Sequence, residues 1–313
     1  MKNKKIVVTG GAGFIGSNLA RHLSNENNHV VVVDNLSTGH LENIQDLIES
    51  DKIEFVKASI TDLNILQDAF KGFDYIFHEA ALPSVPRSIK EPLITNQVNI
   101  NGTLNVLIAA KDTGVKKVIF ASSSSVYGDT PTLPKTEKMI PNPLSPYAVT
   151  KLAGEYYCSV FTEVFHLPTV ALRYFNVYGP RQDPSSEYAA VIPKFIQSIL
   201  SDNSPVVYGD GEQTRDFTFI DDVVHANVLA AESDTTGVFN AAGGKRISIN
   251  ELANTVMALC NKELEIVYEE IRPGDIKHSL SDISKAKEEF GYYPRFDIKN
   301  GLKETIQWFQ KHH

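Results

Sequence analysis

TGGAGFIG, at Thr9–Gly16, is the stretch that decides the fold of this 313-residue chain. It follows a short apolar run, Lys5–Thr9, and opens a helical pattern of apolar residues over Gly16–Ser24. It therefore predicts a glycine turn between a strand and a helix. Glycines let the backbone approach a pyrophosphate closely, and the helix N-terminus offers unpaired N–H groups and partial positive charge. The spacing is G-x-x-G-x-x-G, and a glycine turn alone can be purely structural.

Further apolar runs, separated by helical patterns, extend this unit into a series. The expected strands are Lys5–Thr9, His29–Asp34, Ile53–Ala58, Tyr75–Glu79, Lys117–Ser122 and Thr169–Arg173, and helical patterns cover Asn64–Phe70, Asn101–Thr113 and Tyr147–Phe165. This alternation is typical of βαβ units with a parallel sheet. The predicted fold class is α/β, with a Rossmann-type doubly wound parallel sheet.

The character of the sequence changes after Arg173, where glycine, proline and aromatic residues become frequent. We predict a Rossmann domain over residues 1–174 and a smaller C-terminal α/β lobe mainly over 175–313, with some later segments returning to the first domain. The last helical pattern, Gly301–Lys311, carries Leu302, Ile306, Trp308 and Phe309. That pattern is typical of a docking helix rather than a ligand site.

Composition narrows the possible classes of function. A formal net charge of −8 argues against a nucleic-acid binder, which needs clustered Lys and Arg. The two cysteines, Cys158 and Cys260, are too few for a disulfide framework and favour a reducing compartment. No stretch is long enough for a signal or spanning segment. We expect a cytoplasmic protein without nucleic-acid or membrane partners, and we predict no metal site.

Asp34 strengthens the dinucleotide hypothesis, because it ends the second predicted strand, 18 residues after Gly16. A carboxylate there can accept hydrogen bonds from the adenosine ribose hydroxyls, and its charge would repel a 2′-phosphate. NAD is therefore favoured over NADP. The alternative is a turn residue within the segment Asp34–Gly39.

Tyr147 and Lys151 lie four residues apart in a predicted helix, so their side chains share one face. A tyrosine with a pKa of about 10 is a poor base at neutral pH. A neighbouring ammonium and an oxidised nicotinamide both stabilise its phenolate. Ser122–Ser125 closes the preceding strand and can supply a hydroxyl that orients a substrate oxygen. Y-x-x-x-K is common by chance, but after the glycine turn, Asp34 and the serines it predicts a dehydrogenase-type base.

Together these motifs resemble the extended short-chain dehydrogenase/reductase enzymes that act on nucleotide sugars, over nearly the whole chain. The supporting segments are TGGAGFIGSNL, SSSSVYGD, SPYAVTK, LRYFNVYGPRQDP, YAAVIPKF, GDGEQTRDF and RPGDIKHSLSDISKA. The chain looks most similar to the UDP-N-acetylglucosamine 4-epimerases, relatives of UDP-galactose 4-epimerase. The resemblance implies NAD as cofactor, bound by the Rossmann domain, and a UDP-sugar as substrate, bound mainly by the smaller lobe.

The resemblance also implies roles for single positions, with Ser123 polarising the substrate, Tyr147 acting as base and Lys151 activating it. The implied cofactor contacts are Gly10, Gly13, Phe14, Ile15, Gly16, Asp34, Asn35, Ser37, Gly39, Ser59, Ile60, Ala80, Asn99, Tyr147, Lys151 and Tyr174. The implied substrate contacts are Ser84, Ser123, Ser124, Tyr147, Asn176, Ala190, Val191, Tyr208, Arg215, Arg272, Asp275 and Ser279. The two arginines suit a dianionic diphosphate in their own right. Their alternative is a surface or interlobe ion pair.

Two positions near the cofactor depart from the pattern of the family. Ser59 stands where many relatives carry an aspartate that touches the adenine. Pro83 replaces a lysine found near NAD in bacterial UDP-galactose epimerases. Neither departure changes one of the predicted catalytic residues. His78, at a strand end, is expected to be a packed strand residue and is assigned no role.

The fold alone does not choose the reaction, because hydride abstraction at C4 can precede epimerisation, dehydration or decarboxylation. In the resembling 4,6-dehydratases an Asp-Glu pair stands where this chain has Ser124-Ser125, which cannot perform acid/base work at neutral pH. UDP-glucuronate decarboxylases carry a glutamate at the position of Ser125. Uronate epimerases carry a second arginine after Gly-Pro-Arg-Gln, where Asp183 stands here. The expectation that remains is C4 epimerisation of a neutral UDP-hexose.

Sugar choice is expected to depend on Ser279, whose position is a tyrosine in bacterial epimerases restricted to UDP-glucose and UDP-galactose. A small residue leaves room for a 2-acetamido group, so we expect UDP-GlcNAc and UDP-GalNAc as substrates, with UDP-Glc and UDP-Gal as further candidates. The alternative is that Ser279 is surface polar sequence.

Other hypotheses remain open at this point. They are a UDP-glucose 4-epimerase only, another NAD-dependent nucleotide-sugar dehydrogenase, and a non-catalytic NAD-sensing protein. The helices Val98–Thr113 and Tyr147–Phe165 resemble those that form a four-helix dimer interface in the family, although their apolar pattern would suit core packing equally well. A homodimer is therefore an expectation from the resemblance.

Overall fold

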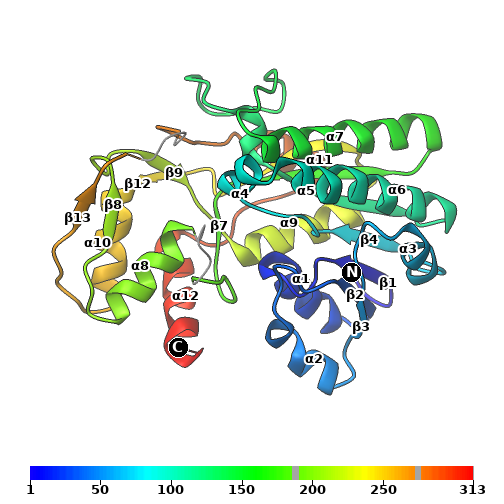
Figure 1. The fold of residues 1–313 in the computed structure, drawn as a ribbon, viewed down its shortest axis with the longest axis horizontal. Coiled ribbons are helices and arrows are strands. Elements are labelled where there is room, and N and C mark those ends of the chain that lie inside the picture. Colours follow the sequence, from blue (N-terminus) through cyan, green and yellow to red (C-terminus); the bar gives the residue numbers. More distant parts are fainter. Residues whose placement is uncertain (185–189, 272–275, 313) are drawn as a thin grey trace.

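A computed structural model of the chain describes residues 1–184, 190–271 and 276–312 (Figure 1). Arg272 and Asp275, two predicted substrate contacts, lie outside the described residues. In the described part, one large sheet forms the centre of the molecule. Its strands are β1 (Lys5–Thr9), β2 (His29–Asp34), β3 (Glu54–Lys57), β4 (Tyr75–His78), β5 (Lys117–Ser123), β6 (Thr169–Tyr174) and β11 (Gly237–Ala241).

The strand order of this sheet is β11-β6-β5-β4-β1-β2-β3, and every neighbouring pair is parallel. Strands successive in the chain run outward from β1 in one direction and from β4 in the other. A ligand crevice is expected at such a switch point, outside the carboxyl ends of the strands. The predicted α/β fold with a doubly wound parallel sheet is confirmed.

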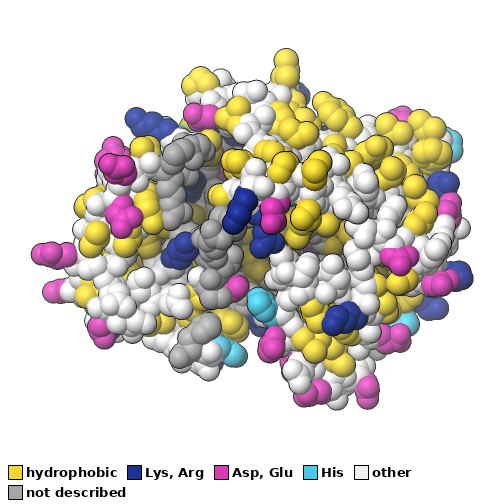
Figure 2. Space-filling model, viewed as in Figure 1, with side chains coloured by type: hydrophobic (Ala, Val, Ile, Leu, Met, Phe, Trp, Pro, Cys, Tyr) yellow, Lys and Arg dark blue, Asp and Glu magenta, His cyan; other side chains and the backbone are white. Residues whose placement is uncertain are grey.

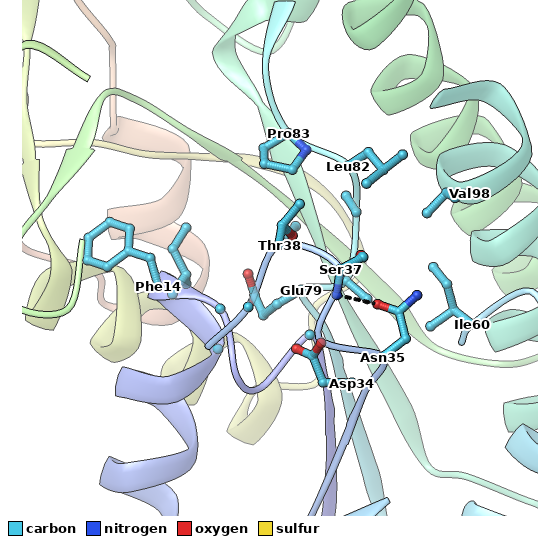
Figure 3. Close-up of a pocket in the computed structure, with 18 of the residues that line it drawn as sticks. Phe14, Asp34, Asn35, Ser37, Thr38, Ile60, Glu79, Leu82, Pro83 and Val98 are labelled. Atoms are coloured by element: carbon cyan, nitrogen blue, oxygen red, sulfur yellow. Dashed lines mark hydrogen bonds between the residues drawn. The ribbon is translucent and has the colours of Figure 1, made fainter. Parts of the chain in front are cut away.

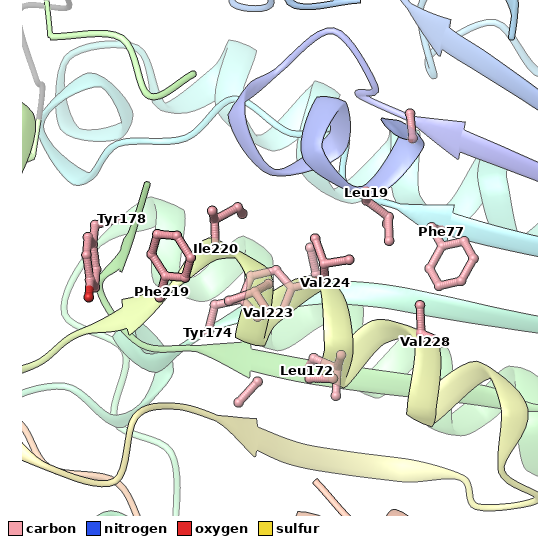
Figure 4. Close-up of a cluster of buried hydrophobic side chains, with 14 of the residues drawn as sticks. Leu19, Phe77, Leu172, Tyr174, Tyr178, Phe219, Ile220, Val223, Val224 and Val228 are labelled. Atoms are coloured by element: carbon pink, nitrogen blue, oxygen red, sulfur yellow. The ribbon is translucent and has the colours of Figure 1, made fainter. Parts of the chain in front are cut away.

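Helices cover both faces of the sheet, as the nearly continuous burial of its central strands requires. Ile6 and Val8 of β1 pack on one face with α1 (Phe14–Ser24) and α9 (Ile220–Glu232). Val7 packs on the other face with α3 (Leu63–Ala69), α6 (Gly102–Asp112) and α7 (Pro146–Phe165). Figure 4 shows the first of these layers, with Leu19 of α1 and Val224 of α9 meeting beside Phe77 of β4.

The largest differences from the predicted elements lie where the sequence signal is short. The seventh strand, β11, was not predicted, because GVFNA is brief and lies within the predicted smaller lobe. Two short helices, α4 (Val85–Lys90) and α5 (Pro92–Asn96), were also missed. The helical pattern expected from Val98 divides into a π-helical turn, Gln97–Asn101, followed by α6.

Cap residues fix the start of α7, the helix that carries Tyr147 and Lys151. The Ser145 hydroxyl accepts a hydrogen bond from the Ala148 N–H, and Pro146 occupies the first helical position. These caps place Tyr147 in the first turn, at the end of the helix that faces the carboxyl ends of the strands.

The smaller lobe is built from short strand pairs and three longer helices. The pairs are β7 (Val177–Tyr178) with β10 (Thr218–Phe219), β8 (Val206–Tyr208) with β13 (Val267–Glu269), and β9 (Thr214–Asp216) with β12 (Arg246–Ser248). The longer helices are α8 (Val191–Leu200), α10 (Ile249–Leu259) and α12 (Ile298–His312). Short helices complete the chain: α2 (Gln45–Glu49), α11 (Ser284–Phe290) and 3₁₀ turns at Leu41–Asn43 and Ser124–Tyr127.

One apolar core runs from the sheet into this lobe. Tyr178 and Phe219 join the layer under α9 to the buried side chains of α8 and α12 (Figure 4). Leu302 and Phe309 of α12 are buried, as expected of a docking helix, whereas Trp308 is partly buried. The two lobes thus share a core, and the proposed division at residue 174 stays a prediction.

Two further expectations can be compared with the structure. Among the described helices, none combines the length and the apolar character needed to cross a membrane. His78 is fully buried, where its ring is hydrogen-bonded to Thr9 (2.8 Å) and Thr103 (2.9 Å). Burial lowers the pKa of His78 to about 3. His78 is therefore a neutral, packed strand residue, as expected.

Candidate active site

A cavity of about 690 Å³ opens at the carboxyl ends of β1, β2 and β4, at the switch point of the sheet. Figure 2 shows this face hollowed between the two lobes, with Lys and Arg side chains beside the hollow. All predicted cofactor contacts except Asn99 line the cavity: Gly10, Gly13, Phe14, Ile15, Gly16, Asp34, Asn35, Ser37, Gly39, Ser59, Ile60, Ala80, Tyr147, Lys151 and Tyr174.

The glycine turn leaves its backbone bare toward the cavity. Gly10 has a positive φ of 71°, and a Cβ there would lie 2.6 Å from the backbone N of Ala80. A Cβ on Gly16 would collide with the backbone of Gly10. Gly13 caps α1 without any side-chain hydrogen bond, so within the described part of the chain the first N–H groups of the helix have no capping side chain. Such a bare helix N-terminus suits a pyrophosphate.

Asp34 both orders the loop after β2 and faces the cavity. Its Oδ2 accepts the Ala12 N–H at 3.0 Å and its Oδ1 accepts the Leu36 N–H at 2.8 Å. Asp34 therefore does stabilise the turn after β2, as the alternative interpretation expected. A carboxylate oxygen can accept more than one hydrogen bond, so ribose hydroxyls can still be bound. The neighbouring Asn35 Oδ1 accepts the Ser37 N–H at 3.0 Å (Figure 3).

Apolar side chains form one wall of the cavity. Ile60, Leu82 and Val98 come from three different segments and lie on the same side of the view in Figure 3. A bare helix N-terminus, a carboxylate at a strand end and an apolar slot are the features that NAD requires. The residues of this cavity therefore fit the predicted cofactor.

Asn99 lies behind this wall rather than in it. Its Oδ1 accepts the Leu82 N–H at 2.8 Å, and its Nδ2 donates to the Leu82 carbonyl at 3.1 Å and to Thr150 Oγ1 at 3.1 Å. It is 2% exposed. Asn99 thus holds the loop after β4 against α7, and the structure places it as a support of the cavity wall.

Several lining residues are absent from the predicted contacts. Among them are Thr38, Glu79, Leu82, Pro83, Arg87, Val98 and Arg181. Glu79 directly precedes the predicted contact Ala80 and Leu82 lies two residues after it, so the rule that strand ends meet at the switch point could have found them. Arg181 lies far away in the sequence and gave no such signal.

Tyr147 and Lys151 meet at the inner end of this cavity. The Lys151 ammonium lies 5.9 Å from the centre of the Tyr147 ring and donates to the Ala121 carbonyl at 2.7 Å. Burial lowers the pKa of Lys151 to about 8, so the side chain is largely cationic at neutral pH. It is placed to stabilise a negative charge that develops on Tyr147.

The pKa of Tyr147 reflects opposing effects. Burial raises it, hydrogen bonding with the Ser123 side chain lowers it, and the negative charge of Glu79 raises it. Ser123 ends β5, and its hydroxyl accepts the Ser125 N–H at 3.2 Å. The structure therefore brings Ser123, Tyr147 and Lys151 together as predicted. Ser123 and Ser124 are half-buried beside the cavity, whereas Ser84 lines it.

A second cavity, of about 260 Å³, lies in the smaller lobe and collects most of the remaining predicted substrate contacts. They are Asn176, Ala190, Val191, Tyr208 and Arg215. Ala190 also lines the larger cavity, so the two adjoin. Arg215 is oriented by hydrogen bonds from its guanidinium to the carbonyls of Thr214 (3.0 Å) and Lys277 (3.3 Å).

Ser279 is buried, with 3% of its surface exposed, so the alternative of surface polar sequence is wrong. Its hydroxyl oxygen accepts hydrogen bonds from Asn176 Nδ2 and from the Asp216 N–H, both at 3.2 Å. It lies directly behind Asn176, a residue that lines the second cavity. A larger side chain at position 279 would have to displace Asn176.

Comparisons with known proteins agree with this arrangement. The chain matches the model of the NAD dependent epimerase/dehydratase family over residues 6–242. It is similar to a UDP-N-acetylglucosamine 4-epimerase from Methanobrevibacter ruminantium M1 solved in complex with UDP-N-acetylmuramic acid. The two are 47% identical, with 100% of each chain covered and a TM-score of 0.97.

Two UDP-glucose 4-epimerases are also similar. One, from Thermotoga maritima and solved with UDP-glucose, is 39% identical, covers 98% of this chain and 99% of its own, and gives a TM-score of 0.94. The other, from Mycolicibacterium smegmatis, is 39% identical over 310 residues, which is 98% of each chain.

Proposed function

The chain belongs to the NAD dependent epimerase/dehydratase family, with NAD as its cofactor, and we propose that it interconverts UDP-N-acetylglucosamine and UDP-N-acetylgalactosamine at C4. Within the family it is a UDP-sugar 4-epimerase. The observation that carries the finer proposal is Ser279, a small buried residue behind Asn176 at the cavity of the smaller lobe.

The residues of the chain supply binding and proton transfer. Bound NAD supplies the group that accepts the C4 hydride and gives it back. Tyr147, as phenolate, takes the proton from O4 and later returns it, while Lys151 stabilises the phenolate and the Ser123 hydroxyl orients O4. Arg215 holds the diphosphate in the adjoining cavity, so the sugar can turn about its linkage and present its other face.

The neighbours of Ser123 favour epimerisation over the other reactions of the family. Dehydration needs a group that protonates a leaving hydroxyl, and Ser124 and Ser125 carry no acid. The Ser125 hydroxyl is buried without a hydrogen-bond partner among the described residues. Without an acid at these two positions, the residues beside Ser123 favour proton exchange at O4 over loss of a hydroxyl group.

The choice of sugar is tested by Ser279→Tyr. The ring displaces Asn176 toward the cavity, so we expect kcat/KM for UDP-GlcNAc to fall by about 100-fold. Activity on UDP-Glc should fall less, because that sugar lacks the 2-acetamido group. Ser284→Tyr is the matched control, since Ser284 is an exposed residue at the start of α11. Unchanged use of UDP-GlcNAc by Ser279→Tyr would remove the proposed gate and leave a UDP-glucose 4-epimerase as the alternative.

The type of reaction is tested by following the reduced cofactor during turnover. An epimerase forms both C4 epimers from catalytic amounts of protein without net release of NADH. A nucleotide-sugar dehydrogenase would release a keto sugar and consume NAD stoichiometrically. Absorbance of free NADH and chromatography of the UDP-sugars in one reaction distinguish the two.

A further inference from the structure

Glu79 is a carboxylate in the cofactor cavity that the chemistry described above does not use. It follows directly on β4 and lines the larger cavity. In the view of Figure 3 it lies in the middle of the lining, between Phe14 and Ile60. Its Oε1 accepts a hydrogen bond from the Tyr174 hydroxyl at 2.8 Å. No Lys or Arg among the described residues forms an ion pair with it.

The hydrogen bonds around Glu79 fix its position. Asn227 of α9 donates from Nδ2 to the Tyr174 hydroxyl oxygen at 2.8 Å, and the acceptors of the hydroxyl proton are Glu79 Oε1 at 2.8 Å and the longer Asn227 Oδ1 at 3.2 Å. Asn227 and Tyr174 are both buried. The carboxylate is thus held by Tyr174 of β6, which is itself held in place by Asn227 of α9.

The titratable groups near Glu79 belong to α7, β6 and its own strand. The negative charge of Glu79 raises the pKa of Tyr147, which disfavours the phenolate. Burial raises the pKa of Glu79 to about 7, and this effect is partly offset by the hydrogen bond from Tyr174 and by the charge of Lys151, the nearby cation. Tyr174 and His78 are both neutral at neutral pH. A carboxylate here therefore works against the base, unless it stabilises another group.

We propose that Glu79 makes the cofactor site select the oxidised form of NAD over the reduced form. The oxidised nicotinamide carries a positive charge and the reduced one is neutral, so a fixed carboxylate attracts only the first. The nicotinamide must approach Tyr147 for C4 chemistry, and Glu79 acts electrostatically on that same residue. At separations of several ångströms and an effective dielectric constant near 20, a preference on the order of tenfold is expected.

This selection rests on NAD as the cofactor and not on the identity of the sugar. A 4-epimerase starts each turnover with the oxidised cofactor, and a site that held the reduced form would accumulate an idle complex. Glu79 thus biases the resting protein toward the form that accepts hydride, while Lys151 keeps Tyr147 able to act.

The test measures which form of the cofactor the protein retains. Purified protein is equilibrated with an equimolar mixture of oxidised and reduced NAD and separated rapidly from free cofactor, and both bound forms are quantified. We expect Glu79→Gln to raise the bound ratio of reduced to oxidised cofactor by about tenfold. Glu54→Gln, an exposed acid at the start of β3, should match the unsubstituted protein. An unchanged ratio in a folded Glu79→Gln protein would overturn the proposal.

Two further variants separate charge from hydrogen bonding. Glu79→Asp keeps the carboxylate and should stay near the original ratio, which covers the case in which Glu79→Gln fails to fold. Tyr174→Phe removes the hydrogen bond but leaves the charge, so it should also retain the preference for the oxidised form. If Tyr174→Phe instead reproduces the Glu79→Gln ratio, Glu79 acts only by positioning Tyr174 and the proposal is wrong.

The pH dependence of the bound cofactor ratio provides an independent test. Glu79 is ionised above its pKa of about 7, so the preference for the oxidised form should increase between about pH 6 and pH 8. Lys151 also titrates near the upper end of this range, and the comparison is therefore the difference between the original protein and Glu79→Gln. A difference independent of pH would contradict the proposal. No sugar is present in these experiments, so failure of the epimerase assignment would leave their outcome unaffected.

Discussion

Burial raises the pKa of the Tyr147 hydroxyl, hydrogen bonding with Ser123 lowers it, and the Lys151 ammonium lies 5.9 Å from the centre of the Tyr147 ring. The Lys151 ammonium is anchored on the Ala121 carbonyl of β5, so its position relative to Tyr147 is fixed by the sheet as well as by α7. Once Tyr147 loses its proton, this fixed cation is placed to stabilise the phenolate against the effects of burial and of the Glu79 charge.

Replacing Lys151 should therefore change the pH profile of the enzyme. In Lys151→Met the phenolate loses its cation, so the pKa of Tyr147 rises and the acid limb of kcat/KM moves to higher pH by about one unit or more. Lys151→Arg keeps the charge and should show a smaller displacement. The measurement is kcat/KM against pH for the three proteins. An acid limb at the same pH in Lys151→Met would show that Lys151 does not control Tyr147.

At the scale of residues, local motifs were predictable and long-range contacts were not. Tyr147, Lys151 and Ser123 follow from a helix repeat and a strand end, and the structure brings them together. Glu79 has no motif of its own, because its setting depends on Tyr174 and Asn227, which are distant in the sequence.

Strands β5 and β6 and helix α7 are joined by a buried ion pair next to the catalytic residues. Glu155, one helical turn after Lys151, accepts hydrogen bonds from Arg173 Nε at 2.8 Å and Nη2 at 2.7 Å and from the Ser122 hydroxyl. Both charged side chains are 4% exposed. The pair therefore fixes the distance between α7 and the strand ends that carry Ser123 and Tyr174.

Removing one partner of this pair should destabilise the protein strongly. Glu155→Gln leaves Arg173 charged and buried without its counter-ion, so we expect the free energy of unfolding to fall by about 3 kcal/mol. Glu163→Gln, an exposed position on the same helix, should change it by less than about 0.5 kcal/mol. Urea denaturation followed by circular dichroism measures both. Equal stability of the two variants would mean that the pair contributes little to holding α7.

At the scale of elements, the length of a pattern decided what could be predicted. The ranges of β1 and β2 agree with the expected strands, and α7 begins one residue before the expected helix. The short elements α4, α5 and β11 lack a full hydrophobic repeat, and their positions depend on packing against α7 and β6.

The whole molecule presents an apolar surface on α5 and α7. Leu93 and Ile94 of α5 and Tyr156, Val160 and Val164 of α7 are exposed. Figure 2 shows hydrophobic side chains gathered over this region of the face. An apolar patch of this kind is unusual on a monomer, and the resemblance of the sequence predicts a dimer interface formed by the helices Val98–Thr113 and Tyr147–Phe165, which includes α7 but not α5. The homodimer stays a prediction.

A charge in this surface should prevent association. Val160→Asp places a carboxylate within the proposed contact, so we expect a monomer, whereas Val267→Asp, at a similarly exposed valine of β13, should leave the oligomeric state unchanged. Light scattering after gel filtration gives the mass of each. A monomeric starting protein, or a dimeric Val160→Asp variant, would contradict a dimer through α7 and the helix over Val98–Thr113.

The central claim, that Tyr147 is a reversible base at C4 of a UDP-N-acetylhexosamine, is tested most directly by one comparison. The unsubstituted protein and Tyr147→Phe are each incubated with UDP-GlcNAc, and the C4 epimers are resolved by chromatography. We predict that the unsubstituted protein forms UDP-GalNAc, and that Tyr147→Phe, with its fold and bound NAD intact, does so at least about 100-fold more slowly. No UDP-GalNAc from the unsubstituted protein, or near-equal rates for the two proteins, would contradict the claim.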